Sequence, residues 1–183
     1  MNKFLAHIRE VDAIAHVVRC FDDENVTHVS SSINPLDDID TVSTELKLAD
    51  LETLQNKLNI LEKKTKTGDK EIKTQIKIVE QLQNQLNNDE RIDYNIFNNK
   101  DFIFYNSLNL ITSKPMLYIC NVDENSIISG NNFSNSIREK VKKEFSEPVI
   151  ISAAIEAQIA EFESKNDKLE MLKDLGYWTL LLG

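Results

Sequence analysis

The chain has 183 residues, and its 30 acidic and 21 basic residues give a formal net charge of -9. This length suits one domain with a small insert, and a hydrophobic share of 41% is typical of a globular rather than a disordered chain. The acidic balance argues against a surface devoted to a nucleic-acid backbone. No apolar run is long enough to cross a membrane, and no signal-peptide core is found near Met1, so we expect a cytoplasmic protein.

The positions of the cysteines and glycines argue against two kinds of site, a zinc site and a glycine-rich phosphate-binding loop. Cys20 and Cys120 lie in apolar runs without a CxxC pattern or a Cys/His cluster, so we expect buried free thiols and no zinc site. The 4 glycines are too far apart to form a glycine-rich loop. The chain therefore lacks the usual cradle for nucleotide phosphates.

The first elements are expected to be a short helix and a buried strand. Residues 2–10 carry apolar side chains at helical spacing, and residues 11–21 form a nearly continuous apolar run rich in β-branched residues, which favours a parallel strand. A polar connection follows over residues 22–40. Within it, Pro35 disfavours helical geometry at Asn34, and Asp37 or Asp38 is suited to begin the next helix.

From Thr41 the apolar period becomes helical. Leucines alternate at spacings of three and four residues, as in the seam of a coiled coil, at Leu51, Leu54, Leu58 and Leu61. A second apolar stripe begins at Ile72, after a lysine-rich break that contains Gly68. Two such helices with a short link predict an antiparallel hairpin over residues 41–95.

The remaining residues alternate between strands and helices. An aromatic segment that ends near Asn109 is expected to be helical and to pack onto the main body. Beyond it, residues 115–120 and 149–151 are predicted strands, and residues 133–145 and 152–163 are predicted helices. This alternation indicates an α/β fold with a parallel sheet, into which the hairpin is inserted.

Polar residues follow the last two predicted strands, where ligands of open parallel sheets collect. Asn121 can brace the adjoining loop or bind a nucleotide base, and Glu124 can accept hydrogen bonds from a base's N–H groups. Ser152, Ala153 and Ala154 form a turn that offers backbone N–H groups without bulk. Each motif taken alone also fits an ordinary turn.

Seven runs together resemble the Obg-like ATPase family named YchF. In chain order they are Asn2-Lys3-Phe4-Leu5-Ala6-His7-Ile8-Arg9-Glu10, His16-Val17-Val18-Arg19-Cys20-Phe21, Thr27-His28-Val29-Ser30, Ile33-Asn34-Pro35-Leu36-Asp37-Asp38-Ile39, Glu45-Leu46-x-Leu48-Ala49-Asp50-Leu51, Asn121-Val122-Asp123-Glu124 and Ser152-Ala153-Ala154-Ile155-Glu156-Ala157. The resemblance covers about residues 2–176. It implies a P-loop NTPase-type sheet that belongs to a partial G domain, formed by residues 1–40 and 96–183. It also implies binding and hydrolysis of ATP, often GTP, with Mg²⁺, and association with the ribosome through its large subunit or rRNA.

The resemblance also assigns roles to single residues. Asn121 and Glu124 match the family's Asn-x-x-Glu, which replaces the Asn-Lys-x-Asp of GTPases and relaxes guanine specificity, and Val122 would lie against the base. The turn at Ser152, Ala153 and Ala154 matches the second base loop. His28 matches the histidine that orients the attacking water; without the resemblance, a surface histidine is the simpler interpretation.

Several family features have no counterpart in this sequence: the Gly-x-x-x-x-Gly-Lys-Ser loop, the switch threonine, the Asp-x-x-Gly segment and the C-terminal TGS domain. Without the ligands for phosphates and Mg²⁺, we expect a central fragment, from a split, frameshifted or truncated gene, that does not hydrolyse nucleotide alone.

Two alternatives stay open. One is a non-enzymatic module whose lysine-rich hairpin tip contacts RNA or a protein, unless that tip is an ordinary solvated turn; its lysines are Lys63, Lys64, Lys66 and Lys70. The other is a chain that forms no stable fold, because parallel strands with unpaired edges aggregate.

Overall fold

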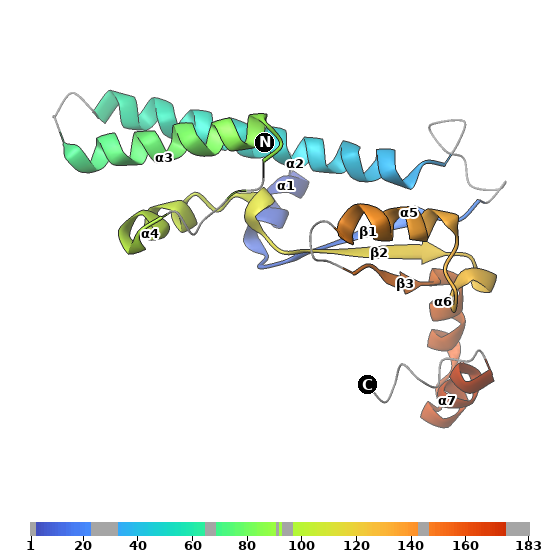
Figure 1. Ribbon diagram of the computed structural model, residues 1–183. Coiled ribbons are helices and arrows are strands. Elements are labelled where there is room, and N and C mark those ends of the chain that lie inside the picture. Colours follow the sequence, from blue (N-terminus) through green and yellow to red (C-terminus); the bar gives the residue numbers. More distant parts are fainter. Residues whose placement is uncertain are drawn as a thin grey trace. The chain divides into compact units, whose positions relative to one another are not determined.

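The computed structural model describes residues 3–22, 33–64, 69–90, 92, 97–142 and 147–174 (Figure 1). The chain divides into two compact units, one made of residues 1–14 and 40–115 and the other of residues 15–39 and 116–183. Each unit has its own hydrophobic core. Within the described residues, no helix combines the length and the apolar character needed to cross a membrane.

The second unit is built on a three-stranded sheet with the order β1-β2-β3. The strands are β1 (Ile14–Cys20), β2 (Met116–Val122) and β3 (Val149–Ile151). β2 and β3 are parallel, and Asn121 is aligned with Ile151. The expected α/β fold with a parallel sheet is therefore confirmed.

Helices follow β2 and β3 along the chain. A short 3-10 helix, η4 (Glu124–Ser126), and α5 (Asn132–Val141) come after β2, whereas α6 (Ala153–Glu161) and α7 (Lys165–Asp174) come after β3. α7 was not predicted as a separate helix. Its apolar positions are too few to show a clear helical period.

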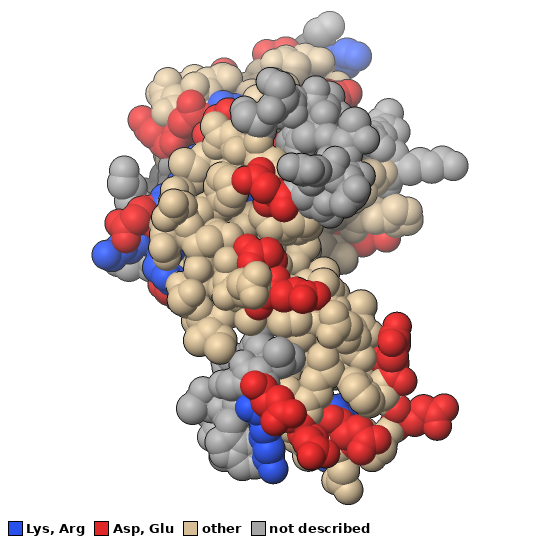
Figure 2. All heavy atoms as spheres, turned by 90° about the vertical axis from the view of Figure 1, so that its right-hand side faces the viewer, with Lys and Arg blue, Asp and Glu red and all other residues tan. Residues whose placement is uncertain are grey.

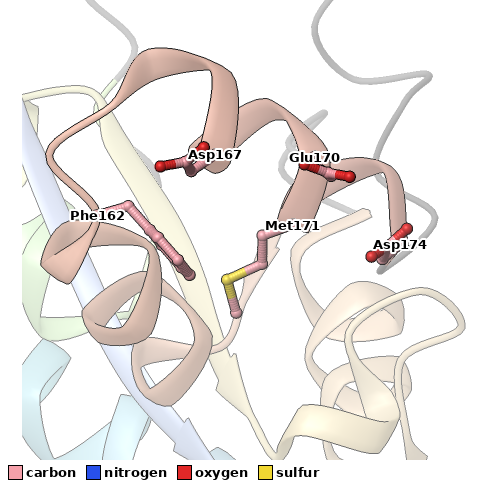
Figure 3. A pocket seen from close by; sticks show the side chains of 5 residues that line it. All are labelled: Phe162, Asp167, Glu170, Met171 and Asp174. Atoms are coloured by element: carbon pink, nitrogen blue, oxygen red, sulfur yellow. The ribbon is translucent and has the colours of Figure 1, made fainter.

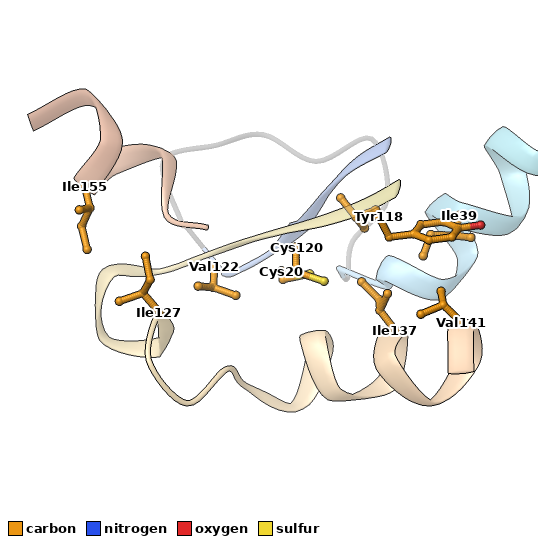
Figure 4. Close-up of a cluster of buried hydrophobic side chains, with 10 residues drawn as sticks. Cys20, Ile39, Tyr118, Cys120, Val122, Ile127, Ile137, Val141 and Ile155 are labelled. Carbon is orange, nitrogen blue, oxygen red and sulfur yellow. The ribbon is translucent and has the colours of Figure 1, made fainter. Parts of the chain in front are cut away.

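The core of this unit lies between the sheet and α5. Side chains alternate along β2, so Tyr118, Cys120 and Val122 are buried on one face, and Figure 4 shows them together with Cys20 above Ile137 and Val141 of α5. Cys20 and Cys120 are free and buried, as predicted. The hydrogen bond with the adjacent Cys120 thiol, together with burial, raises the pKa of Cys20, which keeps this thiol protonated.

α2 (Pro35–Lys64) begins six residues earlier than the helical period at Thr41 indicated. Pro35 occupies the first helical position, where its missing N–H costs no hydrogen bond. The side-chain oxygen of Asn34 accepts a hydrogen bond from the N–H of Leu36 at 3.3 Å, and the carbonyl oxygen of Asn34 accepts one from the N–H of Asp38 at 3.1 Å. Asn34, rather than Asp37 or Asp38, therefore caps the helix.

The first unit contains α1 (Lys3–Glu10), most of α2, α3 (Lys70–Asn87), α4 (Asn99–Ser107) and the 3-10 helix η3 (Ile111–Ser113). α2 and α3 lie side by side in Figure 1. Their predicted stripes supply one hydrophobic core, whose fully buried members include Leu54, Val79 and Leu82. The aromatic segment that was expected on the main body contributes Tyr105 to this same core.

A buried ion pair joins distant segments of the first unit. The Asp50 carboxylate is completely buried and lies 3.1 Å from the Arg9 guanidinium. It also accepts hydrogen bonds from the N–H groups of Ile111 at 3.0 Å and Thr112 at 2.8 Å. One carboxylate in α2 thereby holds α1 and η3, and its two oxygens are fully satisfied, as burial of a charge requires.

Candidate functional site

The carboxyl ends of β2 and β3 meet at one edge of the sheet, because the two strands are parallel and in register. Asn121 is the penultimate residue of β2, and its side-chain oxygen accepts a hydrogen bond from the N–H of Ala153 at 2.9 Å. The Asn121 side chain thus braces the turn that follows β3, whereas the sequence predicted bracing of the loop that adjoins Asn121 itself. Because this bond involves only the side-chain oxygen of Asn121, the Nδ2 group can still donate hydrogen bonds to a ligand.

The turn after β3 leads directly into the first turn of α6. Ser152 is the N-cap residue, but its side chain makes no capping hydrogen bond. The helical hydrogen-bond ladder starts with the N–H of Glu156, which donates to the carbonyl oxygen of Ser152 at 3.0 Å. The N–H groups of Ala154 and Ile155 precede that bond, as is general for the start of a helix.

The Ser152 hydroxyl is the unusual polar group of this turn. Ser152 is fully buried, and its Oγ has no hydrogen-bond partner. Leaving a buried hydroxyl unsatisfied costs on the order of 1–3 kcal/mol. Such a group is expected where a ligand or an ordered water completes the hydrogen bonding.

Glu124 is the second link between the two strand ends. Its carboxylate is exposed and accepts a hydrogen bond from Gln158 Nε2 at 3.0 Å. Segment 121–124 thus contacts α6 at both Ala153 and Gln158. Gln158 was not predicted, because nothing in the sequence pairs positions that lie 34 residues apart.

Asp123 shapes the loop between Asn121 and Glu124. Its carboxylate accepts hydrogen bonds from Ser126 Oγ at 2.7 Å and from the N–H of Asn125 at 3.0 Å. The Ser126 hydroxyl is the main cause that holds the pKa of Asp123 below its ordinary value. Asp123 therefore caps η4, and the loop that carries Glu124 is closed by its own hydrogen bonds.

The end of β1 is fixed by a separate contact. The Nδ2 group of Asn131 donates to the carbonyl oxygen of Cys20 at 2.7 Å, while its Oδ1 accepts from the N–H of Ser134 at 3.0 Å in a capping box. Gly130 has a φ of +71°, and a Cβ there would lie 2.6 Å from Ser134 Oγ. Both the positive φ and the close contact favour a glycine at this position.

Val122 does not lie with the polar residues of the site. It is only 2% exposed and belongs to the hydrophobic core, because alternation along β2 directs it to the face opposite Asn121. A side chain buried in this way is not available to cover a base. The predicted contact of Val122 with a base therefore has no support in its position.

The other predicted residues fall elsewhere. His28 and Lys66 lie outside the described residues. Lys63 and Lys64 form the end of α2, and Lys70 begins α3; all three are exposed. They belong to the first unit, whereas the residues at the ends of β2 and β3 belong to the second.

A shallow hollow lies beside α7 (Figure 3). Phe162 and Met171 form its apolar part, and three carboxylates surround them, those of Asp167, Glu170 and Asp174. Acidic side chains gather over the α6–α7 end of the face shown in Figure 2. Since these charges repel phosphate groups, the hollow is not suited to a nucleotide.

The described residues contain no group of three or more His, Cys, Asp or Glu side chains placed to hold a metal ion. The chemistry at the ends of β2 and β3 is that of hydrogen bonding: an amide, a carboxylate, a buried hydroxyl and helix N–H groups. Such a set can bind the edge of a flat heterocycle that carries both donors and acceptors.

Comparisons with known proteins identify relatives over nearly the whole chain. No family model matches it. It is 43% identical over 175 residues to the "Ribosome-binding ATPase YchF" of Haemophilus influenzae. The matched residues make up 96% of this chain and 48% of that protein. It is also 40% identical over 177 residues to the protein of the same name from Bacillus subtilis. "Obg-like ATPase 1" of Oryza sativa is 35% identical over 163 residues, 87% of this chain and 41% of the rice protein.

A solved structure agrees with these relatives. The Schizosaccharomyces pombe YchF GTPase matches with a TM-score of 0.82 and 28% sequence identity, covering 96% of this chain and 48% of the yeast one. The chain spans about half the length of the curated relatives it matches. With these identities and this shared fold, the chain belongs to the YchF family.

Proposed function

We propose that the ends of β2 and β3 bind the base of an adenine nucleotide, as part of a cytoplasmic, ribosome-associated ATPase of the YchF type. The observation that supports this most is the bond from the N–H of Ala153 to Asn121 Oδ1. It joins the Asn-x-x-Glu segment to the Ser152 turn, and the resemblance assigns base recognition to both.

The donors and acceptors suit adenine. The Nδ2 group of Asn121 can donate to N7 of the base, and the Glu124 carboxylate can accept from the N6 amino group. The N–H of Ala154 adds one small donor at the same turn, whereas the Ser152 hydroxyl is as buried as Val122 and is assigned no base contact. Guanine would instead offer a ring N–H and an amino group, the pair that the shorter aspartate of GTPases accepts.

The residues proposed to bind the base do not include groups that would bind phosphates or a metal ion. The 183 residues contain no Gly-x-x-x-x-Gly-Lys-Ser loop, and the described residues offer no metal cluster. We assign no hydrolytic step to these residues, and we propose that the chain alone binds a base without turning over ATP. Mg²⁺ and GTP belong to the proposal only through the family resemblance, as does a water-positioning role for His28.

Nucleosides are the best probes, because they need no phosphate contacts. Saturation-transfer NMR with adenosine and guanosine should give stronger transfer for adenosine. Glu124→Asp should move the preference toward guanosine by about tenfold, as expected for one base-edge contact. Glu62→Asp, the same change at an exposed position of α2, serves as the matched control. Equal transfer for both nucleosides in all three proteins would refute base recognition.

A second proposed function concerns α2 and α3. We propose that residues 41–95 form the coiled-coil insert within a G domain made of residues 1–40 and 96–183, and that its lysine-rich tip contacts ribosomal RNA of the large subunit. The exposed Lys63, Lys64 and Lys70 at the adjoining ends of the two helices support this. The whole chain has a net charge of -9, so this group of lysines is a local basic region on an otherwise acidic protein.

Ribosome co-sedimentation tests the tip. The double change Lys63→Glu and Lys64→Glu should abolish salt-sensitive binding, because each lost phosphate contact reduces the salt dependence. Lys165→Glu with Lys168→Glu in α7 changes the same number of charges and should have little effect. Binding that survives the first pair, or is lost equally with the second, would exclude the tip.

A further inference from the structure

Gln158 is placed beside the proposed base site by the packing of α6. The side chain of Ile155 is 2% exposed and belongs to the hydrophobic core, and Ile159 packs against that core. These two contacts fix the rotation of α6 about its own axis. Ala154 and Gln158 are also four residues apart, so they lie one above the other on a second, exposed face of α6.

The amide of Gln158 contacts the carboxylate of Glu124. Its Nε2 group donates to Glu124 Oε1 at 3.0 Å. A carboxylate has only acceptor atoms, so the amide nitrogen of Gln158 faces it, rather than the amide oxygen. An amide nitrogen carries two hydrogens, and a carboxylate has two oxygens. The hydrogen-bonded pair therefore still offers one donor, the second N–H of Gln158, and one acceptor, Glu124 Oε2.

The order of this donor and this acceptor along a base edge decides which purine the pair fits. In the proposed site the amide of Asn121 donates to N7, so the edge runs from N7 to position 6 and on to position 1. Adenine has a donor at position 6, its N6 amino group, and an acceptor at N1. Guanine has the opposite order, because its O6 is an acceptor and its N1–H is a donor.

We propose that Gln158 is a specificity-determining residue of this site, which donates its second N–H to N1 of adenine and holds Glu124 toward the N6 amino group. The proposal rests on the base site proposed above and deepens it by naming the contact that rejects guanine. A guanine in the same orientation would place O6 against Glu124 Oε2 and N1–H against the Gln158 N–H. A site whose polar groups are left unpaired in this way discriminates strongly against the wrong ligand.

Glu124 would be a different acceptor without Gln158. Both of its oxygens would then be available, and the ring N–H and amino group of guanine could bind to them as a pair. Gln158→Leu should therefore weaken adenosine binding and strengthen guanosine binding. Glu124 and Gln158 are both exposed, so we expect this variant to fold as the wild type does.

The nucleoside 1-deazaadenosine, in which a C–H group replaces N1, tests the contact directly. Amide NMR titrations of the ¹⁵N-labelled chain give a Kd for adenosine and for 1-deazaadenosine. We expect the wild type to bind adenosine about three- to tenfold more tightly, as is typical of one hydrogen bond. Gln158→Leu should bind the two nucleosides equally.

Gln55→Leu is the matched control. Gln55 is an exposed residue of α2 in the other unit, and its Nε2 group also donates to a side chain, Asn59 Oδ1, at 3.1 Å. This variant should keep the wild-type ratio of the two Kd values. Circular dichroism should show the wild-type helix content for both leucine variants.

The outcomes separate the role of Gln158 from the base site itself. Saturable adenosine shifts at Glu124 and Ala153, with a Kd ratio that Gln158→Leu leaves unchanged, would overturn the role of Gln158 alone. A wild type that binds both nucleosides equally, or a ratio that Gln55→Leu lowers as much as Gln158→Leu does, would have the same consequence. No saturable adenosine binding by the wild type would overturn both proposals.

Discussion

The side-chain oxygen of Asn121, near the end of β2, accepts a hydrogen bond from the backbone N–H of Ala153, the first residue of α6, at 2.9 Å. The two residues are 32 positions apart in the chain. Their bond brings the two predicted base motifs together in one place.

This bond allows the structural and the binding roles of Asn121 to be separated. Asn121→Ala removes the acceptor and should lower the free energy of unfolding by about 1 kcal/mol. Asn121→Asp keeps an oxygen acceptor and should lose little stability, but it removes the amide donor. Urea unfolding followed by circular dichroism measures both. Equal stability of Asn121→Ala and the wild type would show that the bond contributes nothing.

Two ion pairs of the first unit should make very different contributions to the free energy of unfolding. Asp50 is fully buried and holds Arg9 and two backbone N–H groups, so Asp50→Ala should cost about 3 to 5 kcal/mol of unfolding free energy. The pair between Lys47 and Asp89 is shorter, at 2.6 Å, but Asp89 is 77% exposed.

For that reason Asp89→Asn, which removes the charge but keeps a residue that tolerates the φ of +56° at this position, should cost less than about 1 kcal/mol. Each variant removes one aspartate charge, and the two positions differ in burial. Similar losses in urea unfolding would contradict the importance assigned to burial, as would a near-neutral Asp50→Ala.

His16 should make the fold sensitive to mild acid. Burial lowers the pKa of His16 below its ordinary value of 6.5, while Asp38 opposes that shift, and its buried Nδ1 has no partner. Below about pH 6.5 the unfolded chain binds the proton more readily than the folded one, so stability falls as the pH falls.

His16→Phe removes this titration. Between pH 7 and about pH 5.5 the wild type should lose more stability than His16→Phe, as measured by urea unfolding at each pH. Carboxylates titrate equally in both proteins and cancel in the difference. His7→Phe is the control, because the His7 side chain is 80% exposed. Parallel pH profiles for the wild type and His16→Phe would rule out this role.

Gly130 should not tolerate a side chain. Its φ of +71° is in the left-handed region, and a Cβ would meet Ser134 Oγ at 2.6 Å. Gly130→Ala should therefore disturb the capping box of α5 and cost about 1 to 3 kcal/mol. Hydrogen exchange of the first turn of α5 should become faster. Unchanged exchange and unchanged stability would show that the loop relaxes freely.

Local patterns predicted the parts of the fold that depend on neighbours in the sequence. The compact apolar run of β2 and the leucine stripe of α2 mark their elements, Asn121 lies near the end of β2, and Ser152 directly follows β3. The alternation of side chains along a strand would have placed Val122 on the same face as Tyr118 and Cys120, in the core. The resemblance instead suggested a contact with the base, which its 2% exposure does not support.

Long-range polar contacts were not predictable. Arg9 and Asp50 are separated by 41 residues, and Asp50 and Ile111 by 61. Nothing in the sequence near Asp50 shows that a charged residue within a leucine-rich helix is fully buried. Partners of this kind become visible only when the fold brings them together.

The most direct test of base recognition is a titration of the ¹⁵N-labelled chain with adenosine, monitored by amide chemical shifts. We expect saturable shifts at Glu124, Ala153 and Ala154 that Asn121→Asp abolishes, while amides of α4 stay unchanged. Shifts confined to other parts of the chain, such as the hollow beside α7, or shifts that Asn121→Asp leaves intact, would contradict a base site at the ends of β2 and β3.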